Sequence, residues 1–471
     1  MKVKALSRSS AHTTQRECSG DLRKHARNLD PSYHPMQRAR EYTRAVTSAK
    51  IERMFAKPLI GNLGNGHEDA VYQTAVSRTS LLPLLSGSGD GMVKLWDLPT
   101  RTQVAQLNAH TKSITGLAFG TVDAQDFYSC SADGTLRRWS LATVLQSASS
   151  SSTIMTTQES SHSTATPLDT WRISGSFQSL DHHWSEAQFA TSSDSAVQIW
   201  TPERSAPLQT HSDLWGSEDT VNIVRYNPSE PHLIASCSMD RGIGLHDLRT
   251  ASAMKKTILR MRCNDLKWNP MEPLNFLVAN EDYQSYTFDM RQLAQPTKIY
   301  KGHTSAVMSV SWAPTGREFV TGSYDRTIRI FSLLGSQHNG VARDIYHTKR
   351  MQRVFTVQYT LDNKYVVSGS DDTNLRLWKA RASEQLGQLT SREESAQQYR
   401  QALIRKYQHL PQVKQIHKSR KIPKVIKKQT QQAILQKESA ERKQANRIKH
   451  SKPGTFEFTS ERKKIVVKQV D

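Results

Sequence analysis

Aspartates recur in this chain at one fixed spacing, together with serines and histidines, and these are residue types that can transfer protons in catalysis. Each of seven aspartates lies six residues before a tryptophan, a phenylalanine or a histidine. A serine stands two residues before six of these aspartates, and Asn280 takes that place in the fifth unit. The seven pairs are Asp90 and Trp96, Asp133 and Trp139, Asp194 and Trp200, Asp240 and His246, Asp282 and Phe288, Asp325 and Phe331, and Asp372 and Trp378.

Three histidines fit a hydrogen-bond relay with these aspartates. In such a relay the aspartate accepts from the histidine, the histidine bonds a strand hydroxyl, and the hydroxyl bonds the tryptophan. A buried carboxylate needs partners of this kind because its desolvation is otherwise costly. We therefore interpret the recurring residues as structural and not catalytic. The histidines are His67, His110 and His303, which lie 23, 23 and 22 residues before Asp90, Asp133 and Asp325, while His347 fits loosely and the third to fifth units have no obvious histidine.

The elements that must position these residues are clearest in residues 302–333, where runs rich in Val, Ile, Phe and Thr alternate with turn residues. This pattern is typical of antiparallel strands joined by tight turns. One such unit cannot bury both of its faces and needs copies of itself. The residues that end the seven pairs are 43, 61, 46, 42, 43 and 47 positions apart, and all but one gap is close to the roughly 40–45 residues of a propeller blade. The sequence predicts an all-β protein, a seven-bladed β-propeller over residues 55–380.

Two segments depart from the regular repeat. Residues 55–63 precede the first blade, and we expect them to supply the outer strand of the seventh blade, which would close the ring and remove a sheet edge. The one long gap contains residues 145–167, nearly all Ser and Thr, which are expected to form a disordered loop between the second and third blades. The glycine-rich residues 61–66 lack the Lys-Ser/Thr of a phosphate-binding loop and are interpreted as a turn.

The charge is concentrated in the two ends of the chain. The net charge is +8 over residues 1–66, −1 over residues 67–380 and +14 over residues 381–471. Basic arms on a neutral scaffold indicate a polyanionic partner, most simply nucleic acid, although a solubilising tail is the alternative. The four cysteines have no metal-site spacing and are expected to be reduced thiols. No run is long and apolar enough for a membrane span or a signal peptide.

The N-terminal arm, residues 1–54, contains Arg38 and Arg40 within a stretch, residues 35–55, that could form a helix. In the C-terminal region, residues 381–471, a capping box at Ser391 and Glu394 predicts a helix that ends before Pro411. Because Pro423 forbids a continuous helix, the basic segment 413–428 is expected to be extended, and residues 430–450 form a second polar helix. The candidate RNA- or partner-binding cations are Arg38, Arg40, Lys414, Lys418, Arg420, Lys421, Lys424, Lys427, Lys428, Arg462, Lys463 and Lys464.

Two blades end in an aspartate followed by an arginine two residues later. These are Asp247 with Arg249 and Asp289 with Arg291. The pattern resembles the W-D-x-R box of propellers that bind the adaptor of cullin–RING ubiquitin ligases. His246 and Phe288 replace the tryptophan of that box. An ordinary turn at the end of a strand, with an exposed arginine, is the alternative interpretation.

The whole chain resembles the WD-repeat and SOF-domain family. The resemblance rests on the seven blades, on RNLDPSYHPMQRAREYTRAVTSAKIERMFAKPLIGNLGNGHEDAVY before them, and on RASEQLGQLTSREESAQQYRQALIRKYQHLPQVKQIHKSRKIPKVIKK after them. It implies a nucleolar protein of the small-subunit processome that associates with the U3 small nucleolar ribonucleoprotein and is needed for 18S ribosomal RNA processing. Vertebrate members are also described as substrate receptors of cullin–RING ligases.

The sequence therefore predicts a non-catalytic scaffold in the nucleus and nucleolus. Its expected partners are pre-ribosomal RNA, the U3 particle and other processome proteins. We expect no cofactor, no metal, no membrane partner and no small-molecule substrate. The alternative is a substrate receptor of a cullin–RING ligase, which would bind the ligase adaptor through Asp247, Arg249, Asp289 and Arg291.

Overall fold

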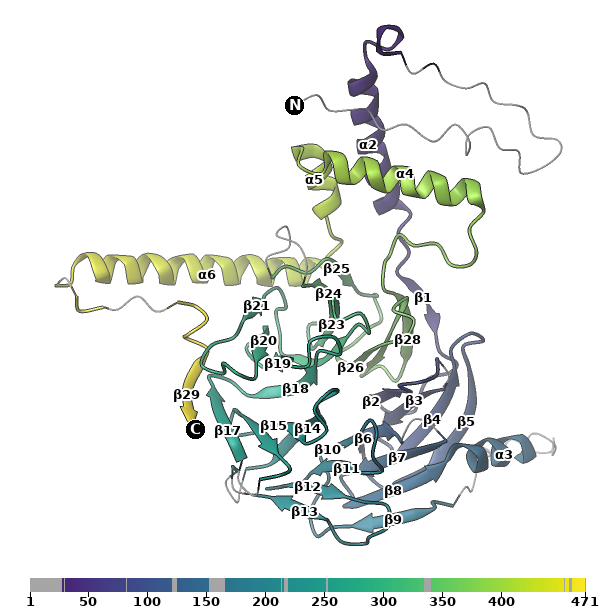
Figure 1. Cartoon of the computed structure of the whole chain (residues 1–471). Helices are drawn as coiled ribbons and strands as arrows, with labels where there is room; N and C mark the ends of the chain where they lie inside the picture. Colours follow the sequence, from purple (N-terminus) through teal and green to yellow (C-terminus); the bar gives the residue numbers. More distant parts are fainter. Residues whose placement is uncertain are drawn as a thin grey trace. The chain divides into compact units, whose positions relative to one another are not determined.

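The computed structural model of the chain describes residues 28, 30–81, 83–120, 125–151, 166–212, 214–215, 219–250, 253–333, 340–452, 454–456 and 460–470. The chain divides into two compact units. One comprises Met1–Pro58 and Arg381–Lys421, and the other comprises Leu59–Ala380 and Ile422–Asp471. The larger unit contains all the sheets (Figure 1).

Seven antiparallel sheets form the predicted seven-bladed β-propeller, and the fold class is confirmed. The first three blades are β2 (Val71–Val76), β3 (Leu84–Ser88), β4 (Met92–Asp97) and β5 (Thr102–Asn108); β6 (Ile114–Phe119), β7 (Asp126–Ser131), β8 (Thr135–Ser140) and β9 (Asp169–Arg172); and β10 (Ser179–His182), β11 (Phe189–Ser192), β12 (Val197–Trp200) and β13 (Gln209–His211). The next three are β14 (Val221–Tyr226), β15 (Leu233–Ser238), β16 (Gly242–Asp247) and β17 (Ala253–Leu259); β18 (Cys263–Trp268), β19 (Asn275–Asn280), β20 (Ser285–Asp289) and β21 (Lys298–Tyr300); and β22 (Val307–Trp312), β23 (Glu318–Ser323), β24 (Ile328–Ser332) and β25 (Asp344–Tyr346). The seventh is β26 (Val354–Tyr359), β27 (Tyr365–Ser370), β28 (Leu375–Lys379) and β1 (Leu59–Asn62).

The blades stand in a ring because each buries its faces against its two neighbours. The first strand of every blade contacts the first strands of the blades before and after it, and β26 contacts β2. Apolar clusters lie between the sheets, as where Leu277 of the fifth blade joins Val307, Phe319 and Phe331 of the sixth. Phe319 and Phe331 are stacked with their ring centroids 5.2 Å apart. The strands of the middle positions are accordingly buried on both faces.

The ring is closed by the strand that precedes the first blade, and this prediction is confirmed. β1 pairs antiparallel with β28, with Leu59 opposite Trp378 and Asn62 opposite Arg376. Leu63, which follows β1, is fully buried, and its backbone N–H donates to the Leu375 carbonyl at 2.9 Å. The seventh blade therefore takes three strands from the end of the propeller sequence and one from its beginning.

The Ser/Thr-rich insertion lies inside a blade, which corrects the predicted position between the second and third blades. Helix α3 (Leu141–Ser151) follows β8, and the chain returns as β9, which pairs with β8 as the outer strand of the second blade. Val144 of α3 is buried against that blade. The expected loop is therefore helical up to residue 151. Residues 152–165 lie outside the described part of the chain.

The smaller unit is helical and joins the two ends of the chain. It contains the short 3₁₀ helix η1 (Pro31–Tyr33) and helices α2 (Gln37–Met54), α4 (Ser391–Tyr407) and α5 (Pro411–Lys418). The helix predicted for residues 35–55 is confirmed as α2, which buries Ala45 and Ala49 and leaves Met36 and Phe55 exposed. The core of this unit comprises Ala45, Ala49, Leu403, Ile404 and Val413.

The start of α4 corrects the predicted capping box by one residue. Thr390, not Ser391, is the N-cap, and its side chain accepts from the backbone N–H of Glu393 while the Glu393 carboxylate accepts from the Thr390 N–H. Because Glu393 and Glu394 are adjacent, the Ser/Thr-x-x-Glu pattern fits two registers in the sequence. Both registers place the helix in the same turn.

The basic segment 413–428 is helical on both sides of Pro423, so the predicted extended conformation is wrong. α5 ends at Lys418, and α6 (Lys424–Lys449) begins directly after Pro423, which is its N-cap. Proline is tolerated at the start of a helix because the first N–H groups have no partner within the helix. The polar helix expected over residues 430–450 is the later part of α6.

The chain adds a fifth strand to the fourth blade. β29 (Val466–Val470) pairs antiparallel with β17, and Ile465 and Val466 pack against the cluster that joins the fourth and fifth blades. The backbone N–H of Arg260 donates to the Ile465 carbonyl at 2.9 Å. This strand was not predicted from the sequence.

We predict that Leu63→Ala destabilises the propeller by about 2–5 kcal/mol, because the substitution leaves a cavity beside the closing strand. Leu59→Ala, at the exposed first residue of β1, is the matched control and should cost less than about 1 kcal/mol. Urea unfolding followed by tryptophan fluorescence measures both. Equal midpoints for the two variants would show that the closing strand does not hold the ring.

Candidate functional site

The recurring aspartates stabilise tight turns between the second and third strands of their blades. In five units the first carboxylate oxygen accepts the backbone N–H two residues later, at 2.7–3.1 Å. The residue directly after the aspartate has a positive φ in six units. Residues other than glycine rarely adopt a positive φ, so the hydrogen bond to the aspartate helps to stabilise the turn. The six residues are Gly91, Gly134, Arg241, Tyr283, Arg326 and Thr373.

The serine two residues before the aspartate completes the same turn. In four units its hydroxyl accepts the backbone N–H of the aspartate, and Asn280 does this with its side-chain oxygen in the fifth unit. The physical reason for the serine spacing, which the sequence alone does not show, is this hydrogen bond. The turn explains why the Ser-x-Asp pattern is present in the fourth blade, which has no histidine in the relay.

The second blade contains the whole predicted relay. Nδ1 of His110 lies 3.2 Å from Oδ2 of Asp133, and Nε2 lies 2.8 Å from the Ser129 hydroxyl. The same hydroxyl accepts from the Trp139 indole N–H at 3.0 Å. All four side chains therefore form one chain of hydrogen bonds from the turn to the interior of the blade.

The first and sixth blades contain parts of this relay. In the first blade, Ser86 joins His67 and Trp96 at 2.6 and 2.7 Å, but Nδ1 of His67 has no hydrogen-bond partner in the described chain. In the sixth blade, His303 joins Asp325 and Thr321 at 2.8 and 2.7 Å, and Phe331 stands in place of the tryptophan.

The other four blades replace the histidine by other groups. Lys256 forms an ion pair with Asp240 at 2.5 Å, the Tyr286 hydroxyl donates to Asp282, and Arg376 donates to Asp372 at 3.0 Å. The Ser176 hydroxyl donates to Asp194 at 2.8 Å. Trp200 and Trp378 donate to a Thr and a Ser hydroxyl, at 2.9 and 2.8 Å. Each aspartate has a partner, which supports a structural role.

Burial keeps several histidines neutral in the folded propeller. It lowers the pKa of His67 to about 3, with a smaller contribution from Lys94, and the pKa of His246 to about 3, with a smaller contribution from His211. Burial also lowers the pKa of His110 to about 4, although Asp133 opposes the shift. These imidazoles bind protons in the unfolded chain at a higher pH than in the folded chain.

We predict that the propeller loses stability as the pH falls from about 6.5 to 4, because unfolded histidines take up protons there and the buried ones do not. Each such histidine contributes a slope of about 1.4 kcal/mol per pH unit. His246→Phe should reduce the slope by about that amount, while the exposed control His450→Phe should leave it unchanged. Urea unfolding at several pH values measures the slope, and an unchanged slope in His246→Phe would contradict this account.

The candidate binding cations are divided between the two units. Arg38 and Arg40 lie on α2, and four further cations lie on α5 or between α5 and residue 421. Lys424, Lys427 and Lys428 occupy the first turns of α6. All the candidate cations are exposed except Arg420, which is half-buried and donates to the carbonyls of His417 and Ser419 at 2.6 and 2.9 Å. The four are Lys414, Lys418, Arg420 and Lys421.

The apolar residues among these cations have different surroundings. Val413 is fully buried and Ile416 is partly buried in the core of the helical unit. Ile426 is buried at the start of α6, whereas Ile422 and Val425 are exposed. The segment is therefore anchored at Val413 and at Ile426 and presents its cations to solvent.

The basic residues Arg462, Lys463 and Lys464 lie next to the strand that joins the fourth blade. Glu461, directly before them, is bridged by Lys301 of the propeller at 2.5 Å and by Lys437 of α6 at 2.6 Å. The two ammonium groups lower the pKa of the Glu461 carboxyl to about 2. Glu461 thus links α6 to the propeller within the larger unit.

The two Asp-x-Arg pairs occupy the same place in neighbouring blades. Asp247 ends β16 and Asp289 ends β20, and each accepts from the arginine two residues later, at 2.8 and 2.7 Å. The side chains of Arg249 and Arg291 are 69% and 68% exposed. Hydrogen bonding to the arginine lowers the pKa of both aspartates. The pairs close local turns and still present two guanidinium groups to a partner.

The described residues also show how the thiols are placed and whether they include a metal site or a membrane-spanning helix. Cys130, Cys237 and Cys263 are free and buried, and burial raises the pKa of Cys130 to about 12. No group of three or more His, Cys, Asp or Glu side chains in these ranges could hold a metal ion. None of the helices described is both long and apolar enough to cross a membrane. Cys18 lies outside the described residues.

Two family models match the sequence. The Sof1-like domain matches residues 380–466, a range that includes α4, α5 and α6. The model described as WD domain, G-beta repeat matches residues 59–97, 101–140, 294–332 and 345–379. The first of these ranges begins at the closing strand β1, which agrees with the place of that strand in the ring.

Relatives align over the whole chain. The DDB1- and CUL4-associated factor 13 of Danio rerio is 41% identical over 471 residues, which cover 100% of both chains. The protein of the same name from Homo sapiens is 42% identical and covers 99% of both chains. Protein SOF1 of Saccharomyces cerevisiae is 39% identical over 99% of this chain and 94% of its own.

A solved structure supports the fold alone. The WD40 β-propeller domain of Doa1 superposes with a TM-score of 0.54 and 18% identity, over 71% of this chain and 98% of that chain.

Proposed function

Because the chain belongs to the family of SOF1 and DDB1- and CUL4-associated factor 13, we propose that it is a non-catalytic scaffold of the small-subunit processome. In this role it acts in nucleolar processing of 18S ribosomal RNA and in biogenesis of the small ribosomal subunit. Its partners are pre-ribosomal RNA, the U3 particle and other processome proteins. The observation that carries the proposal is the full-length similarity to SOF1 together with the Sof1-like C-terminal region.

The distribution of charge supports RNA contact by the C-terminal region and not by the blades. Residues 67–380 carry a net charge of −1, whereas residues 381–471 carry +14. RNA backbones attract such clusters of Lys and Arg, and the association releases counterions. The propeller would then provide rigid surfaces for neighbouring proteins, while the basic region contacts phosphates.

The start of α6 has the local chemistry of a phosphate contact. Its first turn contains no acidic residue and its N-cap, Pro423, makes no side-chain capping bond. The unpaired N–H groups and the helix dipole therefore favour an anion there. Lys424, Lys427 and Lys428 add three exposed positive charges to the same turns. We infer that RNA phosphates bind at this end of α6.

We predict that replacing Lys418, Lys421, Lys424, Lys427 and Lys428 together by Gln weakens RNA binding and incorporation into pre-ribosomes. The structure favours this set over one with Arg420, because Arg420 bonds backbone carbonyls at the end of α5. Loss of five single-strand phosphate contacts should reduce the slope of log K against log salt by up to about 3.5. Filter binding to precursor RNA at several salt concentrations measures this slope.

The matched control removes the same charge from the propeller. Lys112, Arg172, Arg204, Lys349 and Lys364 are all exposed, and their replacement by Gln should leave the salt slope nearly unchanged. Both variants carry a foreign nuclear-import signal, so that a defect in import cannot imitate a defect in assembly. Normal incorporation and normal 18S precursor processing in the C-terminal variant would refute the proposal.

A second function, substrate receptor of a cullin–RING ubiquitin ligase, is favoured by one specific observation. Arg249 and Arg291 are exposed at equivalent positions of adjacent blades, each beside its aspartate. The printed names of the vertebrate relatives state an association with DDB1 and CUL4. His246 and Phe288 stand where the W-D-x-R box has tryptophan, and both are buried, as that tryptophan position is in other blades.

We predict for this second function that Arg249→Ala with Arg291→Ala abolishes co-purification of a DDB1-type adaptor and leaves precursor RNA association intact. Among the residues that the structure describes, these exposed guanidinium groups bond only their own aspartates, so the fold should be unaffected. Arg172→Ala with Arg204→Ala is the control. If the wild-type chain retains no adaptor under conditions that retain precursor RNA, the ligase function does not apply to this protein.

A further inference from the structure

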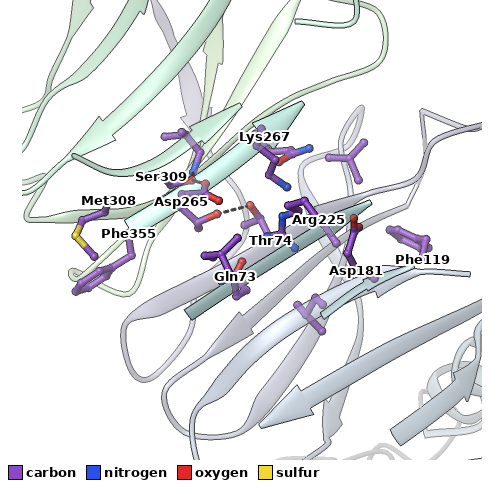
Figure 2. Close-up of a pocket in the computed structure, with 18 of the residues that line it drawn as sticks. Gln73, Thr74, Phe119, Asp181, Arg225, Asp265, Lys267, Met308, Ser309 and Phe355 are labelled. Atoms are coloured by element: carbon purple, nitrogen blue, oxygen red, sulfur yellow. Dashed lines mark hydrogen bonds between the residues drawn. The ribbon is translucent and has the colours of Figure 1, made fainter. Parts of the chain in front are cut away.

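The innermost strands of the propeller enclose a polar cavity of about 170 Å³ (Figure 2). Its lining includes residues from the first strands of all seven blades. Five of the lining side chains are charged, three of them cations and two carboxylates. They are Arg78, Asp181, Arg225, Asp265 and Lys267.

Both carboxylates already have hydrogen-bond donors. Asp265 accepts from the backbone N–H groups of Leu266 and Val310 at 2.9 and 3.0 Å and from the Ser309 hydroxyl at 3.2 Å. Asp181 accepts from the Tyr226 N–H at 2.8 Å and forms an ion pair with Arg78 at 3.3 Å. One of the three cations is thus paired, and the other two are not.

The two remaining cations retain unused donors. Nη1 of Arg225 donates to the Leu180 and Val224 carbonyls and to the Ser179 hydroxyl, at 2.9–3.3 Å. Nε of the same guanidinium is buried and has no partner in the described chain. Lys267 forms no hydrogen bond or ion pair with any described residue, although Asp265 and Asp181 are close enough to favour its charged form.

Arg225 and Lys267 occupy equivalent positions of neighbouring strands. Each is the fifth residue of its six-residue strand, β14 or β18, and these strands are in contact. Burial, and next the Arg225 guanidinium, lower the pKa of Lys267 to about 8. The two cations repel each other, and Asp265 and Asp181 offset only part of that cost, so an anion bound beside both cations would stabilise the folded protein.

We propose that the cavity binds a free phosphate-bearing small molecule, whose phosphoryl group lies between Lys267 and Arg225. The ligand is a bound anion and not a substrate. A phosphate dianion has several acceptor oxygens, which suit the three donors of an ammonium group and the free edge of a guanidinium. The lining by the first strands of all seven blades excludes a folded macromolecule and leaves room for a small molecule.

The test is thermal unfolding of the full-length chain in inorganic phosphate, compared with acetate and chloride at equal ionic strength. Above the Kd, phosphate should raise the Tm in proportion to the logarithm of its concentration, by about 2 °C at ten times the Kd, because it binds the folded state alone. Lys267→Met removes one cation. This variant should need at least tenfold more phosphate than the wild type for the same rise in Tm. The exposed control Lys112→Met should respond as the wild type does.

We expect Lys267→Met to fold, because removal of an unpaired buried ammonium should not lower the Tm measured without phosphate. No rise in the Tm of the wild type beyond that in acetate and chloride, up to 10-fold above cellular phosphate, or an equal rise for Lys267→Met, would overturn the proposal. A phosphoserine peptide that binds far more tightly than phenyl phosphate would overturn the free small molecule as ligand. Precursor RNA association should be unchanged in Lys267→Met, so the result is independent of the RNA-binding role.

Discussion

The rest of the structure depends on the hydrogen bonds between β1 and β28. A sheet edge presents unpaired N–H and C=O groups, and closure of the ring pairs them. Because Leu59 lies opposite Trp378, the chain enters and leaves the propeller at neighbouring positions. Closure therefore brings together residues some 320 positions apart in the sequence, at the point where the helical segments begin.

The helical unit follows from this constraint. α2 precedes β1 and α4 follows β28. The chain segments that lead to these two helices therefore leave the propeller from paired strands. The two helices, with α5, bury one apolar cluster between them and join by Lys406 and Glu41 at 2.9 Å. Neither the N-terminal nor the C-terminal segment has enough apolar residues for a core of its own. Together they have one, which also positions Val413 at the start of the basic segment.

The sequence predicted the elements whose signal is local and repeated. The turn aspartate, with Ser or Asn280 two residues before it and a Trp, Phe or His six residues after it, located all seven blades, because each blade needs the same turn and a buried ring. The insertion was misplaced because β9 is separated from β8 by α3 and residues 152–165, so that its pairing leaves no local pattern. Pro423 was interpreted as a barrier to helix, yet proline starts α6. β29 pairs with a strand some 210 residues away, and its five residues, three of them valine, contain no pattern that identifies that partner.

The central claim is that the blades form a neutral scaffold and that the C-terminal cations contact RNA. It is tested most directly by ultraviolet crosslinking of precursor particles purified through this chain, followed by identification of the crosslinked peptides. The account predicts that RNA-crosslinked peptides come mainly from residues 411–449, around the start of α6 and the residues before it. Crosslinks confined to the blades, residues 59–380, with none in residues 411–449, would contradict it.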